Sequence, residues 1–138
     1  PNVNMTCTNR SRSTTPGQAL FCLNESEHLR SAAFLALRVL EEVPRTRDFQ
    51  EDPVRDSRLQ RMFSYAVSRP ATAEELRVLR DVHDRQRAIF EADPKAATAT
   101  IATFATPADM VAEPLPALAA WMHVARVILN LDEFMVRE

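Results

Sequence analysis

Apolar residues recur at three- and four-residue steps along most of this chain, the spacing that places side chains on one face of an α-helix. The pattern is clearest over residues 114–134, which hold the chain's single tryptophan. Burying that tryptophan removes about 200 Å² from water, roughly 5 kcal/mol as an upper value, so other helices must cover it. This closing helix is predicted to supply the following core or interface residues: Trp121, Met122, Ile128, Leu129 and Phe134.

The same periodicity divides the rest of the chain into segments. Residues 1–13 show no period and are predicted to form an extended lead-in, and residues 14–43 a helical pair, with a proline after Val43. Residues 52–92 are predicted to form a helical hairpin, and residues 93–113 a weak helix and a loop. The predicted starts combine a capping side chain with a proline or with a glutamate three residues on: Thr15-Pro16, Asp52-Pro53, Thr72 with Glu75, and Asp93-Pro94.

The second helix of the predicted hairpin has two distinct faces. Its inner face is predicted to contain Leu76, Leu79, Val82, Ile89 and Phe90. Its outer face carries opposite charges at four-residue spacing: Arg77, Asp81 and Arg85, and Arg80 with Asp84. Such pairs are typical of a solvated helix surface.

Composition supports an all-α fold. The chain has 138 residues with one glycine and nine prolines, whereas hairpin turns in β-proteins need glycine. We therefore predict a single domain over residues 1–138, an irregular bundle of about six helices with short links and no sheet. The short links also predict that the long helices pack as antiparallel neighbours.

Charge and hydropathy exclude two classes of partner. A formal net charge of −2 and a pI near 6.0 give no basic excess for nucleic acid. The longest apolar run is interrupted by His123 and Arg126, so no membrane span is expected. Cys7 and Cys22 are either separate buried thiols or one disulfide, and their redox state stays open.

Histidine, serine and carboxylate spacing indicates no catalytic or metal-binding motif. His28, His83 and His123 fall on three different predicted helices, without the pairing that presents two metal ligands on one face. We expect His83 to be solvated beside Asp84, and His123 to lie at a helix surface or interface. No catalytic, cofactor-binding or metal-ligating residue is therefore predicted in this chain.

The strongest polar cluster precedes the first predicted helix. It consists of Arg10, Arg12, Ser13, Thr14 and Thr15. Unpaired N–H groups at a helix start attract anions, so these residues are candidates for contact with a carboxylate, a phosphate or a protein partner. The alternative interpretation is a helix cap with ordinary structural ion pairs.

Three runs, in order along the chain, carry a family resemblance: Cys7-x-x-Arg10-x-x-Ser13-Thr14-x-Pro16-x-Gln18-Ala19-Leu20 with Leu23-Asn24; Phe63-x-x-Ala66-Val67-x-Arg69-Pro70-x-Thr72-x-x-Glu75; and Ala125-Arg126-x-x-Leu129-Asn130-x-x-Glu133-Phe134. Together they resemble the C-terminal domain of unknown function in large exported proteins of Planctomycetes and relatives. There it often follows a companion domain and an N-terminal cytochrome-c-like segment. The resemblance implies an extracytoplasmic location and a chain corresponding to the last part of a longer polypeptide, since Pro1 falls in mid-domain.

Two functions remain open at the level of sequence. The first is a non-catalytic structural or interaction module, the helical end of an exported multidomain protein or a subunit docking on a larger assembly. Its partners would be the missing part of the parent protein or other subunits. The alternative is an accessory part of an extracytoplasmic enzyme or electron-transfer complex, whose haem or active site lies in a companion domain or chain.

Overall fold

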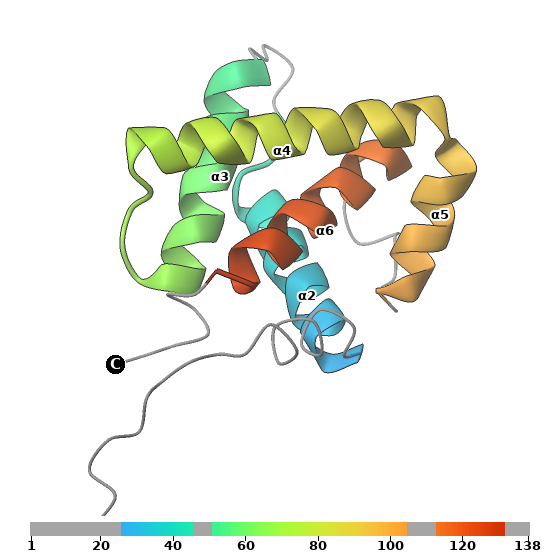
Figure 1. Ribbon diagram of the computed structural model, residues 1–138, viewed down its shortest axis with the longest axis horizontal. Coiled ribbons are helices and arrows are strands. Elements are labelled where there is room, and N and C mark those ends of the chain that lie inside the picture. Colours follow the sequence, from blue (N-terminus) through green and yellow to red (C-terminus); the bar gives the residue numbers. More distant parts are fainter. Residues whose placement is uncertain (1–25, 46–50, 105–112, 132–138) are drawn as a thin grey trace, which may run out of the picture.

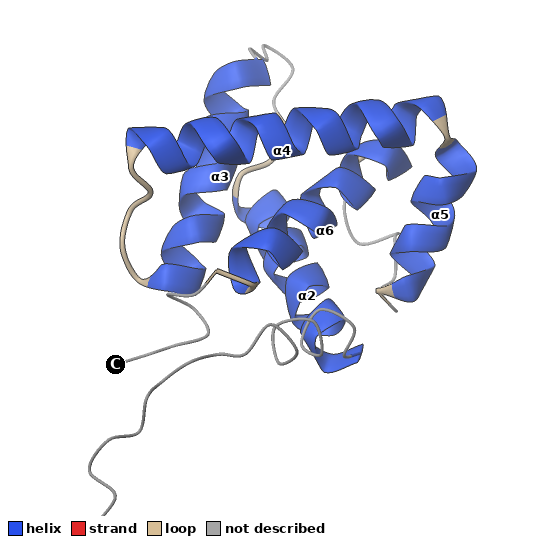
Figure 2. Cartoon of the chain, in the orientation of Figure 1, coloured by secondary structure: helices blue, strands red, loops and turns tan. Residues whose placement is uncertain are grey.

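The computed structural model describes residues 26–45, 51–104 and 113–131, and their regular structure is entirely helical (Figure 2). The helices in these ranges are α2 (Ser26–Glu42), α3 (Glu51–Val67), α4 (Ala73–Ala92), α5 (Pro94–Thr103) and α6 (Leu115–Leu129). The described residues contain no strand. The prediction of an all-α bundle is confirmed.

Helix α6 forms the centre of the bundle. Figure 1 shows it crossing the middle of the molecule, and its largest contacts are with α4, α2 and α5. Ten of its fifteen residues are buried, so it is covered on most sides, as expected for a helix that is apolar nearly all round. Trp121, Met122, Ile128 and Leu129 are among the buried ones, and Phe134 lies outside the described residues. The predicted closing helix is thus a core helix.

Helices α3 and α4 cross steeply in Figure 1, so the predicted hairpin over residues 52–92 is not an antiparallel pair. Both helices also pack on α6. The link between them is short, as the sequence indicates. Short links limit the distance between consecutive helices but leave their crossing angle to the shared core.

Small side chains bring α2 close to the central helix. The buried face of α2 includes Ala32, Ala33 and Ala36, all fully buried, followed by Val39 and Leu40. Helix α6, on which α2 packs, also contains buried alanines. Small side chains on both helices are compatible with close packing in a chain with few aromatic residues.

Helix α4 begins as the sequence predicts. The side chain of Thr72 accepts a hydrogen bond from the Glu75 backbone N–H, and the Glu75 carboxylate accepts one from the Thr72 N–H, so the capping box is complete. The guanidinium of Arg69 donates two further hydrogen bonds to Glu75, at 2.9 and 2.7 Å. Together these contacts lower the pKa of Glu75 to about 2, the bonds from Arg69 having the larger effect. The carboxylate therefore stays ionised over the neutral pH range.

One face of α4 differs from the prediction. Ile89, expected to face inward, has 55% of its surface exposed, and Val78 has 49%. Val78, Val82 and Ile89 follow one another at steps of four and seven residues, so they line one side of the helix. Val78 and Ile89 each lie one residue, about 100° of helix rotation, before the buried Leu79 and Phe90. The described core therefore leaves these two side chains largely exposed, whereas Val82 packs partly against it.

Ser68 ends α3 in the left-handed backbone region, with a φ of 63°. Its N–H donates to the Ser64 carbonyl at 2.9 Å, which closes the last turn of the helix. Because glycine adopts this conformation without a Cβ clash, we expect Ser68→Gly to raise the free energy of unfolding by about 0.5–1 kcal/mol. Ser57→Gly, at an exposed site within α3, should instead lower it by about 0.5 kcal/mol. Urea denaturation of both variants checks this pair, and a loss of stability in both would contradict the backbone argument.

Candidate functional site: an arginine-lined hollow around Trp121

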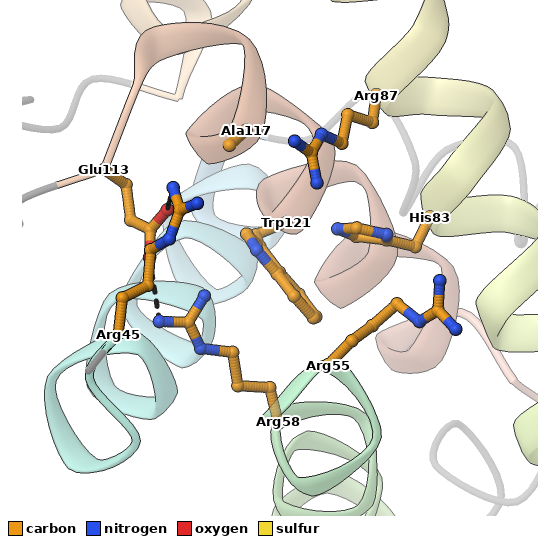
Figure 3. A pocket seen from close by; sticks show the side chains of 8 residues that line it. All are labelled: Arg45, Arg55, Arg58, His83, Arg87, Glu113, Ala117 and Trp121. Carbon is orange, nitrogen blue, oxygen red and sulfur yellow. Dashed lines mark ion pairs between the residues drawn. The ribbon is translucent and has the colours of Figure 1, made fainter. Parts of the chain in front are cut away.

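The candidate site is a hollow where α3, α4 and the start of α6 meet. Its empty space amounts to about 310 Å³ with its open mouth included, and its closed part has room for about one water molecule. Its lining, drawn in Figure 3, consists of Arg45, Arg55, Arg58, His83, Arg87, Glu113, Ala117 and Trp121. Half of these residues are arginines, which is unusual for a hollow in a chain of slightly negative net charge.

A buried ion pair forms one wall of the hollow. Nη2 of Arg58, on α3, lies 2.8 Å from Oε1 of Glu113, and the two side chains are only 4% and 5% exposed. Arg45 adds a second positive charge 3.5 Å from Oε2 of the same carboxylate. Nε of Arg58 also donates to the carbonyl of Val43, after α2, at 2.9 Å. This arrangement links Glu113, two residues before α6, to the segment after α2 and to α3.

The opposite wall is the imidazole of His83, and here the sequence prediction is wrong. His83 was expected to be solvated, but it is 3% exposed and its ring lies 4.3 Å, centroid to centroid, from the ring of Trp121. The prediction gave weight to the charged neighbour Asp84. However, His83 lies four residues after Leu79 and seven before Phe90, which places it on the buried face of α4.

A shared carboxylate positions His83 and Arg55. Oδ1 of Asp84 lies 3.0 Å from Nδ1 of His83 and 3.1 Å from Nη1 of Arg55. A carboxylate only accepts hydrogen bonds, so Nδ1 carries the proton and donates it. Burial lowers the pKa of His83, an effect that the bond to Asp84 partly opposes. The ring is therefore neutral at neutral pH, and its Nε2 is an acceptor.

The charges predicted to pair along α4 instead connect α4 to α3. Arg80, expected to pair with Asp84, donates two hydrogen bonds of 2.7 Å to Asp56 of α3. Hydrogen bonding from Arg80 is the largest cause of the lowered pKa of Asp56. The expected pair of Asp81 and Arg85 does form, at 2.8 Å, and lies in solvent. Two of the five residues of the supposed solvated face, Arg80 and Asp84, thus make contacts with α3 that support the hollow.

Outside the hollow, His123 of α6 packs among aromatic rings. Its ring centroid lies 5.5 Å from that of Phe90 on α4 and 6.0 Å from that of Phe104 after α5. Burial lowers the pKa of His123, and the positive charge of Arg126 lowers it further. His123 is therefore at an interhelical interface, in its neutral form at neutral pH.

The two histidines with lowered pKa values, His83 and His123, predict a loss of stability in mild acid. The unfolded chain binds a proton at each histidine near pH 6.5, whereas the folded chain resists it to lower pH. Stability is therefore full above about pH 7 and falls as the pH drops through about 6.5 toward the folded values. Melting curves between about pH 7.5 and pH 5.5 should show this decline, and the double variant His83→Phe with His123→Phe should reduce it. An equal decline in the double variant would contradict the assignment.

The polar cluster predicted near the first helix is not part of this site as described. Arg10, Arg12, Ser13, Thr14 and Thr15, like Cys7 and Cys22, lie outside the described residues. Sequence reasoning missed the hollow because its members come from separate segments, although Arg58 follows the spacing of the buried Met62 and Ala66. Glu113 carried no sequence signal, since it precedes the apolar run of α6.

The described ranges lack two other features that would indicate a function, a metal-binding cluster and a membrane-spanning helix. No three His, Cys, Asp or Glu side chains of these ranges gather closely enough to hold a metal ion. None of the helices described has the length and apolar character required to cross a bilayer. The hollow around Trp121 is therefore the feature with the most concentrated chemistry in the described part of the chain.

Comparison with known protein families assigns the chain to one of them. A family model described as PSD1, protein of unknown function (DUF1553), matches residues 1–83, which is more than half of the chain. The chain belongs to the DUF1553 family. The match ends within α4 at His83, so it includes Arg55 and Arg58 of the hollow but not Glu113 or Trp121.

Neither a curated protein nor a solved structure matches this DUF1553 chain. The family's description assigns no function. Membership therefore supports the resemblance noted in the sequence at the level of the family, and any function has to be argued from the residues themselves.

Proposed function

We propose that this DUF1553 chain is a non-catalytic helical interaction module, the C-terminal helical part of an exported multidomain protein or a subunit that docks on a larger assembly. The partner is another domain of the parent protein or another subunit, and the chain works outside the cytoplasm. The proposal extends the family membership with the resemblance to exported, Planctomycetes-type proteins, in which the haem, where present, belongs to a companion domain.

The observation that carries the proposal is an apolar side of α4 that the described residues leave partly exposed, formed by Val78, Val82 and Ile89 and here called the α4 strip. Val78 and Ile89 are 49% and 55% exposed, and Val82 between them is half-buried and packs against the core. Single exposed apolar residues are ordinary, but two large ones on one side of a helix, joined by a half-buried third, form a ridge that can dock into a groove of another protein. Transferring this ridge from water to such a groove would supply binding free energy.

An exposed ion pair accompanies the strip. Arg85, seven residues after Val78, lies on the same side of the helix, and Asp81 lies beside it; the two pair with each other in solvent. Interfaces commonly have an apolar centre and a polar rim. This arrangement favours a protein partner over a nucleic acid or a metal ion.

Site-directed photo-crosslinking of the polypeptide that carries this chain, in its native host, tests the proposal. A photoreactive residue at Ile89 should crosslink to one defined protein segment, within the parent or in another subunit. The same residue at Arg77, whose side chain is 70% exposed on a different side of α4, should not. Equal or absent crosslinking at both positions would contradict the docking role. A haem absorption band in the crosslinked complex would favour the alternative, an accessory part of an electron-transfer complex.

A further inference from the structure

The imidazole of His83 lines the hollow with one hydrogen bond left to make. Its Nδ1 donates to Oδ1 of Asp84 at 3.0 Å, so its Nε2 can only accept. This Nε2 is buried and has no hydrogen-bond partner in the described part of the chain. Buried polar atoms in folded proteins are nearly always paired, by the protein or by ordered water. A hydrogen-bond donor is therefore expected next to Nε2.

The arginines of the hollow do not make a comparable demand. Nη2 of Arg58 lies 2.8 Å from Oε1 of Glu113. Nη2 of Arg55 lies 3.0 Å from Oδ1 of Asp52, and its Nη1 lies 3.1 Å from Oδ2 of Asp84. Carboxylates therefore already oppose both positive charges. The requirement that remains is a neutral donor for one imidazole nitrogen.

The size of the hollow decides which donor fits. Its closed part has room for about one water molecule. The same space is lined by guanidinium groups, which can donate to the oxygen of a water. Figure 3 shows the ring of His83 projecting toward Trp121, with the guanidinium of Arg87 on the same side of the indole in this view. A buried water typically has about three polar partners, and this lining offers both a donor and an acceptor.

We infer that the hollow is a binding site for one ordered water molecule. The water donates a hydrogen bond to Nε2 of His83 and accepts one from a guanidinium N–H of the lining. It thereby allows the polar ring of His83 to pack at 4.3 Å from the ring of Trp121 with its acceptor paired. The contact between α4 and α6 then includes this water as part of its packing, and displacing it would cost the hydrogen bond to Nε2.

Nuclear magnetic resonance of the full chain, with its histidines labelled with nitrogen-15, tests this inference at neutral pH. The His83 signals are assigned by their absence in His83→Gln. We expect Nε2 to show the shift of an unprotonated nitrogen that accepts a hydrogen bond. We also expect a cross-peak between water and the methyl group of Ala117 or the ring of Trp121, with the sign of a long-lived complex. Both signals are required, so an unbonded Nε2, a proton on Nε2 or a missing water cross-peak would overturn the inference.

Filling the hollow provides a second test. Ala117 is a buried residue of the lining, and Ala117→Leu places three more carbon atoms beside this space. The Nε2 signal should then move to the shift of an unbonded acceptor, and the water cross-peak to Trp121 should be lost. The matched control is Ala99→Leu, at an exposed position of α5, which should change neither signal. An unchanged Nε2 signal in a folded Ala117→Leu would contradict the inference, and the spectra of the unmodified chain decide it if this variant does not fold.

Discussion

Replacing Glu113 with glutamine is expected to lower the free energy of unfolding by about 3–5 kcal/mol, because it leaves the buried guanidinium of Arg58 without its counter-charge. Both side chains are at most 5% exposed, so water does not replace the lost partner. Arg45 lies 3.5 Å from the same carboxylate, and its charge would add repulsion once Glu113 is neutral. Urea denaturation followed by far-UV circular dichroism measures the loss.

The matched control for Glu113→Gln is Glu74→Gln, which breaks the ion pair with Arg77. Those two side chains are each 70% exposed, so the control should be nearly unchanged in stability. A double variant, Arg58→Met with Glu113→Met, removes both buried charges and should recover most of the loss. If Glu113→Gln were no less stable than Glu74→Gln, the ion pair of Arg58 with Glu113 would not stabilise the packing of α6 on the rest of the bundle.

Truncation of the central helix is the second large effect that we expect. Leu118 of α6 is fully buried, and Leu118→Ala should destabilise the fold by about 2–5 kcal/mol through lost burial and the cavity left behind. Val127→Ala removes apolar atoms from a 38% exposed position of the same helix and should cost less than about 0.5 kcal/mol.

Urea denaturation also measures the stabilities of Leu118→Ala and Val127→Ala. A large difference supports α6 as the helix around which the others pack. Similar small losses in both variants would mean that the bundle stays folded without close packing on α6.

Local rules predicted two of the helix starts, whereas α3 begins at Glu51, so that Asp52 lies inside the helix and is not its cap. The capping box of Thr72 and Glu75 and the start at Asp93-Pro94 are present as expected, since a cap depends on residues within one turn. The apolar stripe over residues 114–134 likewise predicted a buried helix. Such features are determined by residues close together in the sequence, so they can be predicted from it.

Tertiary arrangement followed less directly from the sequence. The apolar residues of α6 occur on nearly every side of the helix, which is the pattern of a central helix, but the short links favoured antiparallel neighbours. Ile89 was expected inside because it is large and apolar, although its phase on α4 matches Val78 and not Leu79. Periodicity therefore contained more information than hydrophobicity alone.

The hollow depends on contacts that no spacing rule supplies. Arg58 and Glu113 are more than fifty residues apart in the sequence but form an ion pair. Each alone would be predicted to be a charged surface residue. His83 could have been placed inside from its phase on α4, but its role as an acceptor follows only from the bond to Asp84. The position of the His83 proton is therefore a property of the folded chain.

The mass of the native particle that contains this chain tests the central claim, a docking role for the α4 strip, most directly. Native mass spectrometry of the polypeptide from its own host should give a complex heavier than the single chain, with its partner released by Val78→Gln combined with Ile89→Gln. The control Arg77→Gln should keep the complex intact. A complex that survives the double change would contradict the docking role, and a lone monomer in the unmodified sample would contradict docking on a separate subunit.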